Sequence, residues 1–121
     1  PVREARATND PKFVGMAERL EGAASALEEA TQCMLATMKA ARETALSGAT
    51  AYLRLAGDTA GGHFLTRSAL AARGNIDAAQ ATALARFFAE DTLSKAPGTV
   101  ASITSASESL RDSGAVLWSA D

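Results

Sequence analysis

The residues of this chain that could perform acid–base or nucleophilic chemistry are few and isolated. His63 is the only histidine, and no carboxylate lies within one helical turn of it to orient the imidazole as a general base. We therefore interpret it as a packed or partly exposed side chain. Ser68, Ser94 and the serines between 102 and 109 lack the strand, turn and helix that expose a nucleophilic serine, so we expect them on helix faces or at caps. No catalytic residue is predicted.

Possible metal ligands are equally sparse. Glu28 with Glu29, and Glu90 with Asp91, are paired carboxylates, but neither pair has the Glu-x-x-His partner of a di-iron helical bundle. We interpret them as members of a solvated face or of ion pairs. Cys33 is the single cysteine and has no other ligand at metal-binding spacing, so we expect a small, partly buried apolar residue. The sequence predicts no metal site.

Residues 52–67 place three glycines inside an otherwise helical run, YLRLAGDTAGGHFLTR. Each interior glycine costs a helix about 0.5–1 kcal/mol relative to alanine, so we expect another helix to approach this backbone closely. Gly57 and Gly61, four residues apart, share one side of the helix, and Gly62 follows. A phosphate-binding loop is a poor interpretation, because no strand precedes the glycines and no Gly-Lys-Ser/Thr follows them.

Two basic and acidic pairs have helical spacing. Arg54 precedes Asp58 by four residues, and Arg86 precedes Glu90 by four. Such pairs contribute only about 0.3–0.5 kcal/mol in water. We hypothesise that Arg54 lies in a partly desolvated seam and fixes the register of two helices through Asp58 and Glu90 or Asp91. The alternative is that both are surface pairs.

The composition favours a small helical protein with thin seams between its helices. Of 121 residues 29 are alanine, and the aromatic residues are four phenylalanines, one tyrosine and one tryptophan. Only three prolines occur and β-branched residues are sparse, which disfavours a sheet. We therefore predict an all-α fold: an antiparallel bundle of three long helices with a kinked or broken C-terminal helix, that is, a three- to four-helix bundle.

Charge and hydropathy set limits on partners. The net charge is −2 with acids and bases interspersed, which predicts no nucleic-acid partner. No apolar run reaches the roughly eighteen residues of a membrane span, and no secretory leader is visible. Because the chain begins with Pro1 rather than methionine, we expect a segment of a longer chain. These observations lead us to expect a cytoplasmic domain without a membrane span.

The sequence predicts a linker over residues 1–9 and a helical domain over residues 10–121. Asp10 followed by Pro11 is typical of a helix start. Apolar residues then recur at intervals of three and four, which predicts a helix of about eight turns. We place a turn near residues 42–44, with Thr44 or Ser47 as the next cap. The predicted core stripe consists of Phe13, Met16, Leu20, Ala23, Leu27, Ala30, Met34 and Met38.

The C-terminal half contains clearer stop signals. The second helix is expected to run to Arg73, where Gly74 supplies a left-handed stop, and Asp77 is predicted to open the third helix in a capping box. Pro97 predicts a kink or short break before residues 99–110. We expect the apolar tail, residues 115–118, to dock on the bundle. The predicted core stripe of the third helix is Ala81, Leu84, Ala85, Phe88, Thr92, Val100 and Ile103.

Two segments carry a family resemblance. Residues 52–67 contain an aromatic residue, Leu-Arg-Leu, a glycine, a Gly-Gly pair and an apolar run with arginine, and residues 85–90 read ARFFAE. In this order and spacing they resemble the C-terminal helical domain of acyl-CoA dehydrogenases, in the branch that includes methylmercaptopropionyl-CoA dehydrogenase. The resemblance covers about residues 13–110. Ala56 and His63 depart from it, since the family usually has an aromatic residue and often tryptophan at these positions.

The resemblance implies a non-catalytic C-terminal accessory domain of an FAD-dependent flavoprotein oxidoreductase of fatty acid metabolism. It would pack against the catalytic domains of the parent enzyme or support a dimer or other homo-oligomer. No position matches the family's catalytic or flavin-binding motifs, so FAD is expected in the parent and no cofactor in this segment. The structural or interface candidates are Arg54, Gly57, Asp58, Gly61, Gly62, Arg86 and Glu90.

Two other functions remain open. The alanine-rich helices and the apolar tail also suit a stand-alone helical-bundle interaction module without enzymatic activity. A pocket near Gly57 and His63 that binds a small molecule is the weaker possibility.

Overall fold

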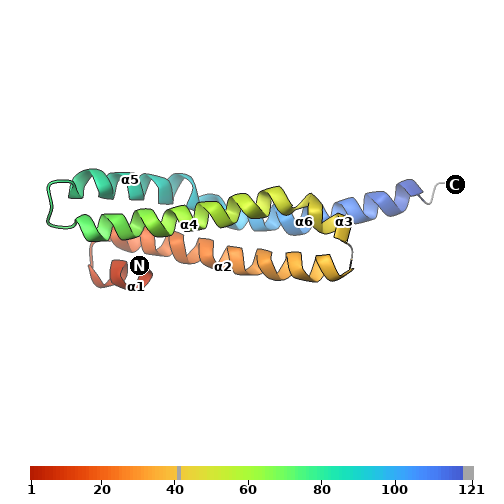
Figure 1. Cartoon of the computed structure of the whole chain (residues 1–121), viewed down its shortest axis with the longest axis horizontal. Coiled ribbons are helices and arrows are strands. Elements are labelled where there is room, and N and C mark those ends of the chain that lie inside the picture. The colour runs from red at the N-terminus through yellow and green to blue at the C-terminus, as the bar shows by residue number, and fades with distance from the viewer. Residues whose placement is uncertain (41, 119–121) are drawn as a thin grey trace.

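The computed structural model describes residues 1–40 and 42–118, and helices account for nearly all of them. The long helices are α2 (Pro11–Ala40), α4 (Ala49–Ala72), α5 (Ala78–Asp91) and α6 (Ala96–Trp118), with short helices α1 (Val2–Ala7) and α3 (Arg42–Ser47) and the 3₁₀ turn η1 (Leu93–Lys95). They form an elongated antiparallel bundle (Figure 1). No strand occurs among the described residues. The predicted all-α bundle is confirmed.

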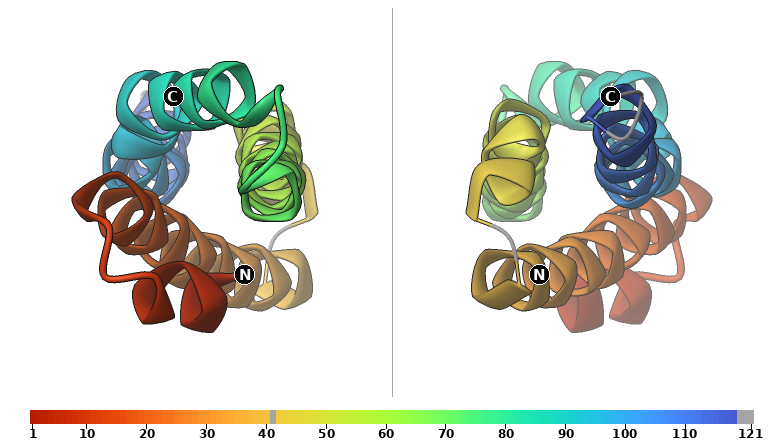
Figure 2. Two further views of the ribbon diagram at one scale, coloured as in Figure 1. Left: turned by 90° about the vertical axis from the view of Figure 1, so that its left-hand side faces the viewer. Right: turned by 90° about the vertical axis from the view of Figure 1, so that its right-hand side faces the viewer.

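The four long helices surround a common axis when the bundle is viewed from its ends (Figure 2). Helix α2 packs against α4, α5 and α6, and α4 packs against α5 and α6. Because α5 and α6 follow one another along the same side, they form the predicted third long segment with a break in it.

Helix α2 begins as its sequence predicts. The Lys12 backbone N–H donates to Asp10 Oδ1 at 2.9 Å, and Pro11 occupies the first helical position, where its missing N–H costs nothing. The predicted stripe is largely inside: Phe13, Met16, Leu20, Ala23 and Ala30 are buried, and Leu27 and Met34 pack against them. Met38 departs from the prediction, because it is 48% exposed near the end of the helix.

The prediction of a linker over residues 1–9 does not hold in the structure. Residues 2–7 form α1, which packs on α2 and buries Ala5 completely. Arg6 pairs with Glu21 of α2. Asn9 then reverses the chain with a φ of 54°. A helix of six residues is too short to show periodicity, and its stability comes from contacts with α2 that the local sequence cannot reveal.

The junction between the first two long helices differs in detail from the prediction. Helix α2 ends at Ala40, Ala41 lies outside the described residues, and α3 follows before α4. The N-cap of α4 is Gly48, not Thr44 or Ser47. A Cβ on buried Gly48 would lie 3.4 Å from both Ile103 Cγ2 and Met34 Sδ. A methyl group at this cap would therefore contact side chains of both α2 and α6.

The later boundaries follow the predicted signals more closely. Gly74 lies in the turn that follows α4. Its φ of 83° is a conformation that favours glycine. Asp77 is the N-cap of α5, but its side chain makes no capping hydrogen bond, so the predicted capping box is absent. The predicted break is present as η1, and Pro97 lies in the first turn of α6. Helix α6 itself bends by 20°.

The core is narrow because alanine supplies most of its buried positions. Met16, Ile103 and Thr66 are the largest fully buried side chains. On the third segment the core stripe is also largely as predicted, with Ala85, Val100 and Ile103 buried, although Leu84 is 56% exposed. The side chains of residues 115–118, predicted to dock, lie outside the described residues; their backbone ends α6, which runs past the end of the bundle (Figure 1).

Candidate functional site

The seam between α4 and the third segment leaves little space for a side chain at two of the predicted glycines. A Cβ on Gly62 would lie 2.6 Å from Leu93 Cδ1, and one on Gly61 would lie 3.3 Å from Phe88 Cζ. Gly62 and Leu93 are both buried. The absence of side chains at Gly61 and Gly62 thus lets α4 approach α5 and η1, which is the role the sequence predicted for glycine here.

Gly57 has a different environment. A Cβ built on it would meet nothing within 4 Å, so the bundle itself does not require glycine at this position. Gly57 is exposed on the side of α4 that points away from the core, together with Leu53, Ala60 and Phe64. We call these four residues the α4 outer face. The predicted close approach at Gly57 therefore does not occur within this chain.

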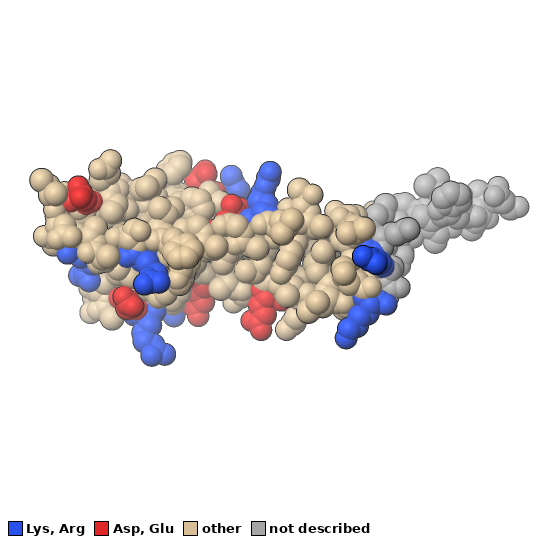
Figure 3. All heavy atoms as spheres, viewed as in Figure 1, with Lys and Arg blue, Asp and Glu red and all other residues tan. Residues whose placement is uncertain are grey.

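The α4 outer face is apolar and largely uncovered. Leu53 is 67% exposed and Phe64 is 62% exposed, and on neighbouring α5 Phe87 is 68% exposed. Figure 3 shows a broad area without charged side chains over the part of the molecule where Figure 1 places α4. The sequence analysis missed this face because almost every side of α4 is apolar or small, so periodicity could not indicate which side the bundle covers.

Arg54 does not have the role hypothesised for it. The side chain is exposed, and within residues 1–40 and 42–118 no ion pair joins it to Asp58, Glu90 or Asp91. The hypothesis failed because Arg54 lies at the edge of a solvent-filled groove and not in a desolvated seam. Asp58 is half-buried and lines a separate recess of about 240 Å³, which Arg54 also lines.

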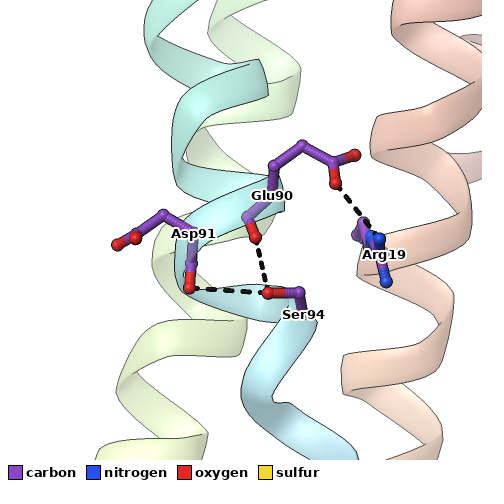
Figure 4. Close-up of polar contacts among 4 residues, drawn as sticks. All are labelled: Arg19, Glu90, Asp91 and Ser94. Atoms are coloured by element: carbon purple, nitrogen blue, oxygen red, sulfur yellow. Dashed lines mark hydrogen bonds and ion pairs between the residues drawn. The ribbon is translucent and has the colours of Figure 1, made fainter.

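Glu90 makes a contact that crosses the bundle. Its Oε2 lies 3.1 Å from Arg19 Nη2, which ties α5 to α2 and replaces the predicted pair with Arg86 (Figure 4). Both side chains are about half exposed, so the pair stabilises the fold by at most about 1 kcal/mol. The Ser94 hydroxyl donates to the Glu90 carbonyl at 2.5 Å, which satisfies a carbonyl near the end of α5.

Two open recesses in the surface have polar residues in their linings. One, of about 370 Å³, contains Arg86 together with Asp10, Lys12 and Arg73. Arg73 also lies 5.6 Å from the centroid of the Phe13 ring. The other, of about 750 Å³, is a groove between α4 and the start of α6; its lining consists of Arg54, Lys95, Ala51, Gly98 and the hydroxyl residues Ser47, Thr50, Ser94, Thr99 and Ser102. Neither recess includes Gly57 or His63.

The remaining chemically interesting residues are packed as ordinary structural groups. His63 is half-buried, and its ring meets that of Phe64 edge to face at 5.3 Å between centroids. Cys33 is half-buried, with Sγ 4.0 Å from Thr37 Oγ1. Among the described residues no group of three or more His, Cys, Asp or Glu side chains is arranged to hold a metal ion. In the same part of the chain, no helix has the length and apolar character needed to cross a membrane.

The described residues form an all-helical bundle with one uncovered apolar face on α4. The chain belongs to the family described as Acetyl-CoA dehydrogenase C-terminal like, whose sequence model matches residues 2–113. This match confirms, for the family as a whole, the resemblance seen in residues 52–67 and 85–90, and it extends to the N-terminal helix α1. No curated protein and no solved structure matches the chain.

Proposed function

We propose that this chain is a non-catalytic C-terminal accessory domain of an FAD-dependent acyl-CoA dehydrogenase, in the branch that includes methylmercaptopropionyl-CoA dehydrogenase. The observation that carries the proposal is the family match over residues 2–113. The domain packs against the catalytic domains of the parent enzyme, which bind FAD and oxidise the acyl-CoA thioester in fatty acid metabolism. We place the parent enzyme in the cytoplasm.

The structure is compatible with a packing role. Its long helices are joined by short connections, and alanine and glycine residues lie where the helices pack together. Exposed apolar side chains on α5, Leu84 and Phe87, give it surface suited to contact with another protein. Within the described residues the titratable groups are dispersed over separate helices, so this proposal assigns the chemistry to the preceding domains.

The test is the nature of the native protein. An antibody raised against this domain would be used to isolate it, and its intact mass and visible spectrum would be recorded together. A chain far heavier than 12.4 kDa with flavin absorbance is the expected result. A colourless chain of about this mass would overturn the proposal.

A stand-alone helical interaction module is the second candidate, and the exposed Leu53, Phe64 and Phe87 favour it. The same measurement separates the two functions, because the module predicts a small chain without flavin. Acyl-CoA added to the purified chain should leave its melting temperature unchanged under both proposals, whereas a shift would support a small-molecule site.

A further inference from the structure

The α4 outer face has a symmetric pattern of residue sizes. Leu53, Gly57, Ala60 and Phe64 follow one another at intervals of four, three and four, so the order large, small, small, large is the same in both directions. The midpoint lies between residues 58 and 59. These spacings also place the four residues on one side of the helix.

We propose that α4 packs on α4 of a second copy of this chain across a two-fold axis through that midpoint. A two-fold interface uses the same patch on both subunits, so the patch must complement itself. With the two helices antiparallel, Leu53 of each copy faces Phe64 of the other, and Gly57 faces Ala60. A parallel arrangement would not use the symmetry of the pattern.

The order of sizes fits two helices that cross. Crossing helices are closest at the crossing point and diverge on either side, so small residues belong at the centre and large residues beyond them. Gly57 and Ala60 lie next to the midpoint, and Leu53 and Phe64 fill the diverging space. The crossing also gives a reason for Gly57. A glycine inside a helix reduces the stability of that helix, and no contact within the single chain requires glycine at this position.

A comparison within the chain supports this interpretation of Gly57. Gly22 of α2 is also a helical glycine with nothing within 4 Å of a built Cβ. Its neighbours at the preceding turn and two turns later, Glu18 and Glu29, are exposed carboxylates, as expected of a solvated surface. The residues at the same two spacings from Gly57, Leu53 and Phe64, are instead exposed and apolar, and exposed Arg54 lies beside them.

The helix is long enough for the proposed contact. Helix α4 has 24 residues and is therefore about 36 Å long, so two such helices can hold all four residues of the α4 outer face from each copy. This inference does not depend on a flavoenzyme parent.

The first test is the mass of the 121-residue chain in solution over a concentration series. The wild type should approach twice 12.4 kDa. Phe64→Glu should weaken association by at least about 100-fold, because the two-fold symmetry brings one unpaired carboxylate from each copy into the interface. Ile76→Glu is the matched control: Ile76 is 98% exposed in the loop after α4, so its change should leave the dimer intact. Circular dichroism would verify that both variants fold.

The second test is cross-linking in a Cys33→Ser background. In the proposed register the two copies of Ala60 are offset by only about 4.5 Å along the helix direction, so Ala60→Cys should cross-link efficiently. Ala24→Cys, at an exposed alanine of α2, should not.

Three outcomes would overturn the proposal: a monomer at every concentration, a dimer unaffected by Phe64→Glu, or equal cross-linking at both cysteines. If the α4 outer face is shielded only in a longer native chain that carries further domains, the face forms a contact with those domains. This result would also overturn the proposal. None of these outcomes would change the flavin test of the proposed function.

Discussion

Gly62 and Leu93 interlock: the leucine side chain occupies the space in which a Cβ on the glycine would stand, with three of its carbons within 3.2 Å of that point. Leu93 is 2% exposed, so its side chain has little room to move away. The contact joins the middle of α4 to η1, the break between α5 and α6. The two long segments therefore have a fixed register at this point.

Gly62→Ala should reduce the free energy of unfolding relative to Gly22→Ala by about 1–3 kcal/mol. Both changes gain the same helix propensity, but only the first forces Leu93 to move. Urea denaturation of the two variants would measure the difference. Equal stabilities would mean that Leu93 repacks without cost.

Ala5→Asp should lower the free energy of unfolding by about 1–3 kcal/mol, because it places a carboxylate where α1 meets α2 and no water reaches. Ala7→Asp, at an exposed position of the same short helix, is the control and should change it by no more than about 0.5 kcal/mol. Thermal melts followed by circular dichroism would compare them. A harmless Ala5→Asp would restore the interpretation of this segment as a linker.

Asp10→Ala should cost about 1 kcal/mol, since the carboxylate accepts a hydrogen bond from the Lys12 backbone N–H at the start of α2. Asp77 is the corresponding residue of α5, but its side chain makes no such bond, so Asp77→Ala should have a smaller effect. Denaturant titration of both variants would show the contrast. The reverse order would contradict the assigned caps.

Arg54→Leu should change the free energy of unfolding by less than about 0.5 kcal/mol, because Arg54 is exposed. The sequence-based hypothesis of a desolvated seam predicts unfolding or loosening of the domain instead. A single melting curve decides between them, and a large loss of stability would reject the structural assignment.

The contact between Arg19 and Glu90 should have a coupling energy below about 1 kcal/mol, which decreases as salt is added. A double-mutant cycle with Arg19→Ala and Glu90→Ala would measure it at low and high ionic strength. A larger, salt-independent coupling would indicate that the pair is desolvated.

The sequence predicted those features that local physical chemistry determines. Asp10, Gly74 and Pro97 each act through their own backbone or that of near neighbours, and each marks a helix end or break in the structure. The core stripe of α2 was also predictable, because charged residues mark its opposite side.

The remaining features depend on where distant segments lie. Ala5 is buried by α2, and Glu90 turns to Arg19 rather than to Arg86, although helical spacing suggests Arg86. Helix spacing could not distinguish Gly57 from Gly61 either, since only the position of Phe88 restricts the space at Gly61. The sequence did not reveal the α4 outer face for the same reason, because the side of α4 that stays uncovered depends on where the distant segments pack.

The alanine-built core has a consequence for the tolerance of this protein to substitution. At Ala17, Ala23, Ala30 and Ala69 the buried side chain is a single methyl group, so truncation removes almost no apolar volume and costs mainly helix propensity. Enlargement at the same positions has no space to occupy and must separate two helices. The usual asymmetry of protein cores is thus reversed here, and mutations that add atoms should be the more damaging class.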